Sequence, residues 1–261
     1  MTTGEPERVD RSSRTSSDYG PLCSLVYQLD KPVGTSSGDV EFYRDLLAGT
    51  SGEILEPAVG TGRILIPLLQ AGFRVRGFDP SPAMLTICRD NCAAHGLDPV
   101  LFEADLVTFQ EPAAFAAVVI PTGSFALVTG RERAAQALRN LRESLRPGGR
   151  LIVDVEPLEQ STSPGPLRHW WLGDEMLTLS SLPPAQPEEG VVSSWLRYER
   201  WRDGRLVETE LQNFSLQRYD LDGFAALLRE AGFTAVTVHA DYQAGLSPTP
   251  DSHVWTFVAT A

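Results

Sequence analysis

The sequence predicts an α/β protein with a doubly wound, mostly parallel seven-stranded sheet, an antiparallel last strand, and a β-hairpin insertion that forms a lid. Three observations support this prediction. Strand and helix patterns alternate from residue 52 to 156, which is typical of a parallel sheet covered by helices on both faces. Glycines mark the ends of the helical segments. The alternation then stops, and Asp203-Gly204 between two β-like runs predicts a hairpin.

Two short helices are expected before the first strand. The first rests on apolar residues that recur at helical spacing, and the second on the same spacing within 39–48; the first set is Leu22, Leu25, Val26 and Leu29. Residues 1–17 are almost without apolar side chains and cannot offset their ordering entropy. They are predicted to be a flexible tail, with the folded domain spanning 18–261.

The alternating region predicts strands at 52–56, 74–79, 99–105, 115–120 and 150–156, and helices at 62–71, 82–95 and 131–146. Gly72 and Gly96 end the first two helices, and Pro147-Gly148-Gly149 ends the third. A helix at 221–231 and strands at 234–240 and 253–261 complete the predicted sheet.

Residues 157–214 are interpreted as an insertion that covers the substrate. Its first part, 157–190, is rich in Pro, Ser and Gly and is predicted to be irregular. Pairing across the hairpin turn would set Arg197 opposite Glu210, and Glu199 opposite Glu208. Two facing carboxylates cost stability unless an arginine or a cationic substrate relieves them, and a solvated ladder of charges is the alternative.

Composition limits the classes of partner. The 261 residues include 22 Lys+Arg and 34 Asp+Glu, a net charge of −12, which disfavours nucleic acid or anionic lipid as the main partner and leaves small molecules. No apolar run approaches the roughly 20 residues of a membrane helix, and the N-terminus lacks the apolar core of a signal peptide, so a cytoplasmic protein is expected. The cysteines, Cys23, Cys88 and Cys92, lack a second pair that would complete a zinc site, so free thiols and no metal are expected.

A strand, a glycine turn and a helix start follow one another in residues 54–63. Gly60 and Gly62 allow the backbone to approach a ligand closely. Asp79 ends the next strand, where a carboxylate can accept both hydroxyls of a ribose. The pattern indicates an adenosine-type site, and the alternative is a tight turn that binds nothing. A dinucleotide is disfavoured because Arg63 replaces the third glycine of its motif and Ala58 the first.

Further motifs follow the later strands: Asp79-Pro80-Ser81-Pro82-Ala83-Met84, Glu103-Ala104-Asp105-Leu106, Ile120-Pro121-Thr122-Gly123-Ser124 and the segment LRPGGRLIVDV. With these motifs the sequence resembles the class I S-adenosylmethionine-dependent methyltransferases, in particular small bacterial enzymes whose first motif is E-P-x-x-G-T-G-R. The resemblance is strong over residues 40–156 and moderate over 215–261. It implies a Rossmann-like fold and S-adenosylmethionine as the cofactor.

The resemblance also implies roles for individual residues. The glycine loop would contact the methionine part of the cofactor, and Asp79 would hold the ribose. Met84 would pack on the adenine face, although helix core packing is an equal alternative. Asp105 and the backbone of Leu106 would read the adenine amino edge. The implied set is Glu56, Ala58, Gly60, Gly62, Asp79, Met84, Asp105, Leu106, Ile120 and Thr122, of which the last two would line the sulfonium end.

Methyl transfer is an in-line displacement in which positioning and water exclusion can supply most of the reduction of the activation barrier. A catalytic side chain is therefore optional. If the acceptor carries a proton, a base must remove it, and His169 in the insertion is the preferred candidate. Its alternative is an exposed histidine in a lid packed by aromatic residues. Tyr27, Glu199 and Tyr242 are expected to contact substrate, with ordinary packing or solvation as their alternatives.

The sequence therefore predicts an S-adenosylmethionine-dependent methyltransferase that acts on a small-molecule acceptor, such as a specialised metabolite. A noncatalytic protein that binds S-adenosylmethionine is one alternative, and a nicotinamide-dependent oxidoreductase is another. Because the implied cofactor residues lie between Glu56 and Ser124, the insertion is expected to control the acceptor and not the cofactor.

Overall fold

A computed structural model describes residues 19–186 and 188–261 of the chain. The predicted tail at 1–17 lies outside these residues. The main sheet contains the strands β1 (Glu53–Pro57), β2 (Arg74–Asp79), β3 (Leu101–Glu103), β4 (Phe115–Ile120), β5 (Leu145–Val155), β10 (Thr234–Ala240) and β11 (Trp255–Thr260). Its helices are α1 (Pro21–Asp30), α2 (Asp39–Leu46), α3 (Leu65–Gln70), α4 (Pro82–Ala94), α5 (Arg131–Ser144) and α6 (Leu221–Glu230), with a 3₁₀ turn η1 (Ser124–Leu127).

The seven strands lie in the order β10-β11-β5-β4-β1-β2-β3. Neighbours from β5 to β3 are parallel, whereas β11 runs antiparallel to both β5 and β10. The doubly wound sheet with an antiparallel last strand is therefore confirmed. The order of the strands reverses between β4 and β1, and ligands of open α/β sheets bind at the carboxyl ends of the strands beside such a point.

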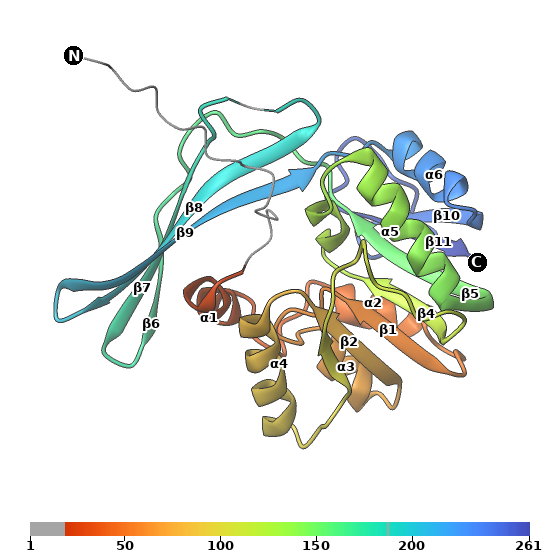
Figure 1. Ribbon diagram of the computed structural model, residues 1–261, viewed down its shortest axis with the longest axis horizontal. Coiled ribbons are helices and arrows are strands. Elements are labelled where there is room, and N and C mark those ends of the chain that lie inside the picture. The colour runs from red at the N-terminus through yellow and green to blue at the C-terminus, as the bar shows by residue number, and fades with distance from the viewer. Residues whose placement is uncertain (1–18, 187) are drawn as a thin grey trace, which may run out of the picture.

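Helices cover both faces of this sheet (Figure 1), and each face has its own apolar core. One core packs side chains of α5 and α6 against the sheet, including the fully buried Leu138 and Phe224. The other packs α2, α3 and α4, including Tyr43 and Leu65. The two cores hold the carboxyl ends of β1, β2 and β4 together at one edge, where the glycine loop lies.

A second sheet, here called the lid sheet, contains β6 (Arg168–Leu172), β7 (Glu175–Leu182), β8 (Val191–Arg202) and β9 (Arg205–Gln217). It is antiparallel throughout and projects from the main domain at the left of Figure 1. The prediction that 157–190 is irregular was therefore wrong for its central part. Gly173 with φ 62° precedes Asp174 in the turn between β6 and β7, and this Gly-Asp pair is a hairpin signal that the flanking prolines obscured.

The hairpin of β8 and β9 was predicted correctly, but its register was not. An irregularity between Arg200 and Trp201 shifts the pairing by one residue, so that Tyr198 faces Glu210 and Arg200 faces Glu208. Such a bulge adds one residue to one strand, so every pair farther from the hairpin turn is shifted by one residue. Glu199 therefore faces Thr209, and the predicted pair of facing carboxylates does not form.

The two faces of the lid sheet differ because side chains alternate along a strand. On one face Leu177 and Tyr198 pack against Leu22 and Val26 of α1. The other face leaves large side chains in solvent, including Trp171, which is 62% exposed. Helix α1 thus fastens the lid sheet to the rest of the chain.

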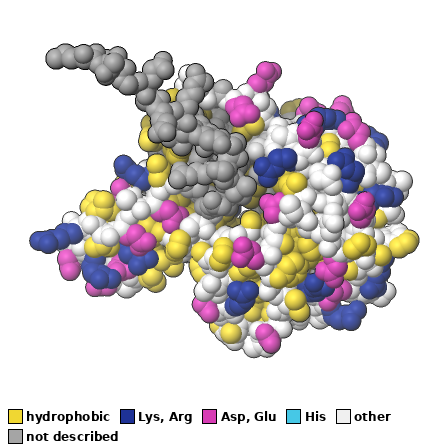
Figure 2. All heavy atoms as spheres, in the orientation of Figure 1, with side chains coloured by type: hydrophobic (Ala, Val, Ile, Leu, Met, Phe, Trp, Pro, Cys, Tyr) yellow, Lys and Arg dark blue, Asp and Glu magenta, His cyan; other side chains and the backbone are white. Residues whose placement is uncertain are grey.

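Acidic and basic side chains are interspersed over the face of the molecule shown in Figure 2. The three cysteines are buried free thiols, as expected. Within the described part of the chain, no helix is long and apolar enough to cross a bilayer.

Candidate functional site

The glycine loop after β1 has an unusual backbone. Ala58, Gly60 and Gly62 have φ values of 53°, 55° and 87°, in the left-handed region that favours glycine. A Cβ on Gly62 would lie 2.9 Å from Cys88 Sγ, so only glycine lets the loop lie this close to α4. A non-glycine residue such as Ala58 in this conformation costs free energy, and such strain gathers at functional sites.

Asp79, at the end of β2, organises this loop. It is 5% exposed, its Oδ2 accepts a 3.0 Å hydrogen bond from Gly60 N, and its Oδ1 accepts one of 2.9 Å from Ser81 N. Burial raises the pKa of Asp79 to about 6, against the opposing effect of these two N–H groups. Each carboxylate oxygen still has a free lone pair, so Asp79 can accept from two neighbouring hydroxyl groups.

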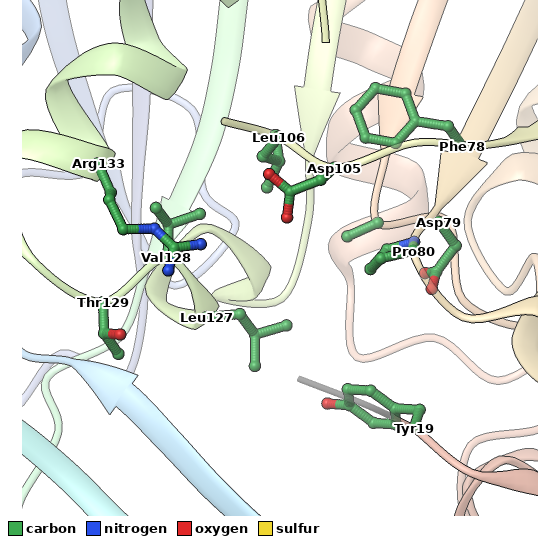
Figure 3. A pocket seen from close by; sticks show the side chains of 11 residues that line it. Tyr19, Phe78, Asp79, Pro80, Asp105, Leu106, Leu127, Val128, Thr129 and Arg133 are labelled. Atoms are coloured by element: carbon green, nitrogen blue, oxygen red, sulfur yellow. The ribbon is translucent and has the colours of Figure 1, made fainter. Parts of the chain in front are cut away.

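A cavity opens beside Asp79 at the carboxyl edge of the sheet (Figure 3). The carboxylate of Asp79 comes from the end of β2 and that of Asp105 from the segment after β3, and the guanidinium of Arg133 lies on the other side of Asp105. Tyr19, just before α1, closes one side with its ring. The full lining is Tyr19, Ala58, Phe78, Asp79, Pro80, Asp105, Leu106, Leu127, Val128, Thr129 and Arg133.

The structure brings several of the predicted cofactor residues together in this cavity, namely Ala58, Asp79, Asp105 and Leu106. Met84 is 2% exposed in α4 and Ile120 is fully buried in the sheet, and neither is among the residues that line the cavity. The sequence assigned no role to Phe78, residues 127–129 or Arg133, which belong to none of its motifs, nor to Pro80, which lies within the motif that begins at Asp79.

Glu56, at the end of β1, is 1% exposed, and its Oε2 has no hydrogen-bond partner. Burial raises the pKa of Glu56 well above its usual range, although the charge of Arg63 opposes this effect. Buried carboxylate oxygens nearly always have partners, so an unpaired one at the start of the glycine loop indicates a place for a missing donor.

Arg63, the last residue of the first motif, is held away from the cavity by a buried ion pair. Its Nη2 lies 2.6 Å from Asp39 Oδ2, and its Nη1 donates to Thr35 O at 3.2 Å. Burial tends to raise the pKa of Asp39, but the hydrogen bond and charge of Arg63 outweigh it and hold this pKa below its usual value. The pair fastens α2 to the glycine loop.

Another buried carboxylate, Asp154 in β5, was not anticipated. It accepts hydrogen bonds from Tyr43 Oη, from Thr122 N at 2.8 Å, from Thr256 Oγ1 at 2.7 Å and from Tyr242 Oη at 3.1 Å. Burial raises the pKa of Asp154 in spite of these donors. The network fixes the loop after β4, which contains the predicted residue Thr122. It also occupies the hydroxyl group of Tyr242, a predicted substrate contact.

Glu156 follows β5 and is half-buried at the same edge. A Cβ on Gly123 would lie 3.2 Å from its Cδ, so the carboxyl group packs against the loop after β4. Burial raises the pKa of Glu156, while Lys31 lowers it.

The other predicted substrate residues lie in two places. Tyr27 of α1 is over the glycine loop, where its Cε1 would be 3.9 Å from a Cβ on Gly60. His169 and Glu199 share the lid-sheet face opposite α1, because His169 pairs with Thr178, and Thr178 pairs with Glu199. His169 is exposed, and Glu199 accepts a 3.2 Å hydrogen bond from Thr178 Oγ1. The structure therefore separates His169 and Glu199 from the cavity.

Comparison with known sequences agrees with this geometry. Residues 54–149 match a family described as a methyltransferase domain. A putative methyltransferase from Geobacillus sp. (strain WCH70) is 25% identical over 190 residues, 72% of this chain and 76% of that protein. A demethylmenaquinone methyltransferase from Thermus thermophilus is 40% identical over 103 residues, 38% of this chain and 45% of that protein. The sequence comparisons support a methyltransferase.

Solved structures show the same fold over nearly the whole chain. An S-adenosylmethionine-dependent methyltransferase from Clostridium acetobutylicum has a TM-score of 0.73 at 16% identity and covers 90% of this chain and 96% of its own. The sugar N-methyltransferase KedS8 from Streptoalloteichus has a TM-score of 0.73 at 20% identity, covering 100% and 98%. The amino pentose methyltransferase CalS10 from Micromonospora echinaspora has a TM-score of 0.66 at 19% identity, covering 94% and 98%. The Rossmann-like methyltransferase fold is therefore established.

Proposed function

We propose that this protein transfers a methyl group from S-adenosylmethionine to a small-molecule acceptor. The observation that carries the proposal is the buried Asp79 carboxylate, which is held by Gly60 and Ser81 beside a cavity and keeps one lone pair free on each oxygen. A ribose presents two adjacent hydroxyl groups at the spacing of such a carboxylate.

The remaining residues of the cavity fit the other parts of this cofactor. Asp105 offers a carboxylate at the far side from Tyr19, suited to an adenine amino group, and Leu106, Phe78 and Pro80 offer apolar surface for its ring. At the other end of the glycine loop, the orphaned Oε2 of Glu56 provides an acceptor for the ammonium group of the methionine part, directly or through a water. These residues therefore suit an amino-acid nucleoside.

S-adenosylmethionine would supply a methyl group already activated by a positively charged sulfur. The protein then needs to hold the two reactants in line and to exclude water. The Asp154 network serves the first need, because it fixes the backbone N–H of Thr122 and with it the loop between cavity and sheet edge. Tyr19 and Tyr27 serve the second by covering the cavity and the glycine loop.

A small-molecule acceptor is supported by two observations. The net charge of −12 disfavours nucleic acid as the substrate. Two of the structural neighbours are named for sugar or amino pentose substrates.

We assign Glu156, in place of His169, as the base that removes a proton from the acceptor. It lies at the carboxyl edge of the sheet next to the loop after β4, whereas His169 lies on the outer face of the lid sheet. Its carboxylate would take a proton from the acceptor nitrogen or oxygen, whose electron pair then attacks the methyl carbon as the carbon–sulfur bond breaks. A carboxyl pKa raised by burial brings the base closer to neutral pH.

Calorimetric titration with S-adenosylhomocysteine tests the cofactor assignment without an acceptor. Asp79→Ala should weaken binding about tenfold or more, because charge-assisted hydrogen bonds contribute roughly 1.5–3 kcal/mol. Asp98→Ala is the matched control, since Asp98 is exposed and lies outside the cavity. Unchanged affinity in Asp79→Ala, or no binding by the wild-type protein, would overturn the proposal.

A further inference from the structure

Helix α1 lacks a cap from its own sequence. Its N-cap is Gly20, which has no side chain, and its first turn contains no acidic residue. The first N–H groups of a helix need acceptors, because no carbonyl of the helix reaches them. An acidic group at this end also interacts favourably with the helix dipole.

The missing acceptor comes from the lid sheet. Glu210 of β9 accepts hydrogen bonds from Leu22 N at 3.0 Å and from Cys23 N at 3.3 Å, across 188 and 187 residues of sequence. Two positions further along β9, Gln212 accepts from Cys23 Sγ at 3.4 Å. The carboxylate thus caps α1 as a side chain of the helix itself usually would.

Gly20 makes room for this contact. A Cβ at position 20 would lie 2.4 Å from Glu210 Oε2, closer than any real contact. The backbone of Gly20 is extended, with φ −75° and ψ 178°, a conformation open to any residue. The glycine is therefore needed for the approach of the carboxylate and not for its own dihedral angles.

The same end of α1 borders the cofactor cavity. Tyr19, adjacent to Gly20, lines the cavity with its ring, and its carbonyl accepts a 2.7 Å hydrogen bond from Ser81 Oγ. Ser81 N in turn donates to Asp79. On the other side the Tyr19 ring meets Phe214 of β9 edge to face, at 6.5 Å between centroids. Tyr19 is thus held between the lid sheet and the ribose-binding carboxylate.

We propose that Glu210 is a latch that retains the cofactor: by capping α1 from the lid sheet it holds Tyr19 over the cavity, so that the lid controls cofactor release. This inference rests on the proposed function for the identity of the ligand. It departs from the sequence-based expectation that the insertion governs the acceptor alone. Opening of the latch frees two N–H groups of α1 and releases Tyr19 from the cavity wall.

Two measurements on the purified protein test the latch. The first is hydrogen exchange of the Leu22 and Cys23 amides without any ligand, and the second is the dissociation rate of S-adenosylhomocysteine from surface-immobilised protein. In Glu210→Ala, loss of a helix cap should speed both by about tenfold, with exchange in β4 and β5 unchanged. Glu208→Ala is the matched control: Glu208 lies on the same face of β9, 44% exposed and paired with Arg200.

Gly20→Ala provides a second route to the same result and covers the case in which Glu210→Ala folds poorly. In the wild-type background the new Cβ collides with Glu210, so hydrogen exchange and ligand release should both be faster. In the Glu210→Ala background the same substitution should have little further effect. Additive effects of the two substitutions would contradict a direct contact.

The outcomes separate this inference from the proposed function. If the wild-type protein does not bind S-adenosylhomocysteine, the proposed function fails, and the retention role fails with it. If the wild-type protein binds it and Glu210→Ala releases it at the wild-type rate, only the latch is overturned. Faster exchange at Leu22 and Cys23 with an unchanged release rate would likewise reduce Glu210 to a structural helix cap.

Discussion

The protonation state of Asp79 should govern cofactor affinity. Burial raises the pKa of Asp79 to about 6. Only the charged carboxylate has acceptors alone on both oxygens, so it suits the two ribose hydroxyl groups better than the protonated form does. Binding should therefore release a proton, and affinity should increase as pH increases through about 6. We expect S-adenosylhomocysteine to bind about tenfold more weakly at pH 5 than at pH 7.5.

Calorimetry at both pH values, with Asp79→Asn as the control, checks this prediction. Asparagine cannot ionise, so the Asp79→Asn protein should bind S-adenosylhomocysteine more weakly than the wild type at pH 7.5. Its affinity should also lack the part of the pH dependence that Asp79 causes. Equal pH dependence in both proteins would assign the titration to another group, such as the buried Glu56.

Replacement of Glu156 and replacement of His169 should have different effects on turnover. On an acceptor that the wild-type protein methylates, Glu156→Gln should lower kcat by roughly 10²–10⁴ and remove the acidic limb of its pH profile, because the amide cannot accept the proton. His169→Ala should leave kcat within about twofold, since its ring lies on the outer face of the lid sheet. The reverse result would restore His169 as the base, as the sequence predicted.

At the scale of elements, the pair of Arg63 and Asp39 joins α2 to the glycine loop. The Asp39 side chain is 2% exposed and that of Arg63 is 10% exposed, so removal of one partner leaves the other charge buried. Arg63→Met should lower the free energy of unfolding by about 3–5 kcal/mol. Urea unfolding followed by circular dichroism measures this change.

The double variant Arg63→Met/Asp39→Asn is the informative control for this pair. Because it removes both charges, it should recover part of the stability that Arg63→Met loses. If the single variant is as stable as the wild type, the pair does not fasten α2 and the loop conformation has another cause.

The lid sheet shows where local pattern misleads at this scale. Its outer hairpin follows from Asp203-Gly204, but the register depends on a bulge beyond Arg200 that no local preference required. Its inner hairpin, β6 and β7, lies between proline-rich segments whose composition suggested irregular structure. The inner hairpin is stabilised by pairing with β8 and by packing on α1, and α1 is distant in sequence.

At the scale of the whole molecule, ligand identity separates the remaining functions. S-adenosylhomocysteine should raise the melting temperature, because a ligand that binds only the folded state stabilises it by mass action. Nicotinamide dinucleotides should not, since Arg63 occupies the place of a motif glycine. A shift with the dinucleotide and none with S-adenosylhomocysteine would favour an oxidoreductase. A shift without transfer to any nucleophile would favour a noncatalytic binding protein.

The sequence by itself determined the features that depend on near neighbours in the chain. The alternation of strands and helices, the glycine loop and the position of Asp79 at a strand end all follow from patterns within about ten residues. The main sheet was therefore predicted nearly element by element, and Ala58, Asp79, Asp105 and Leu106 do line one cavity.

Tertiary structure alone decided the contacts that join distant segments. Asp154 collects donors from Tyr43, Thr122, Tyr242 and Thr256, and Glu210 caps a helix 188 residues away. A carboxylate in a strand has the same local pattern whether it faces solvent, a hydroxyl group or a helix end. Its partner depends on which surfaces the packing of the two sheets and α1 brings together, and no short segment of the sequence contains that information.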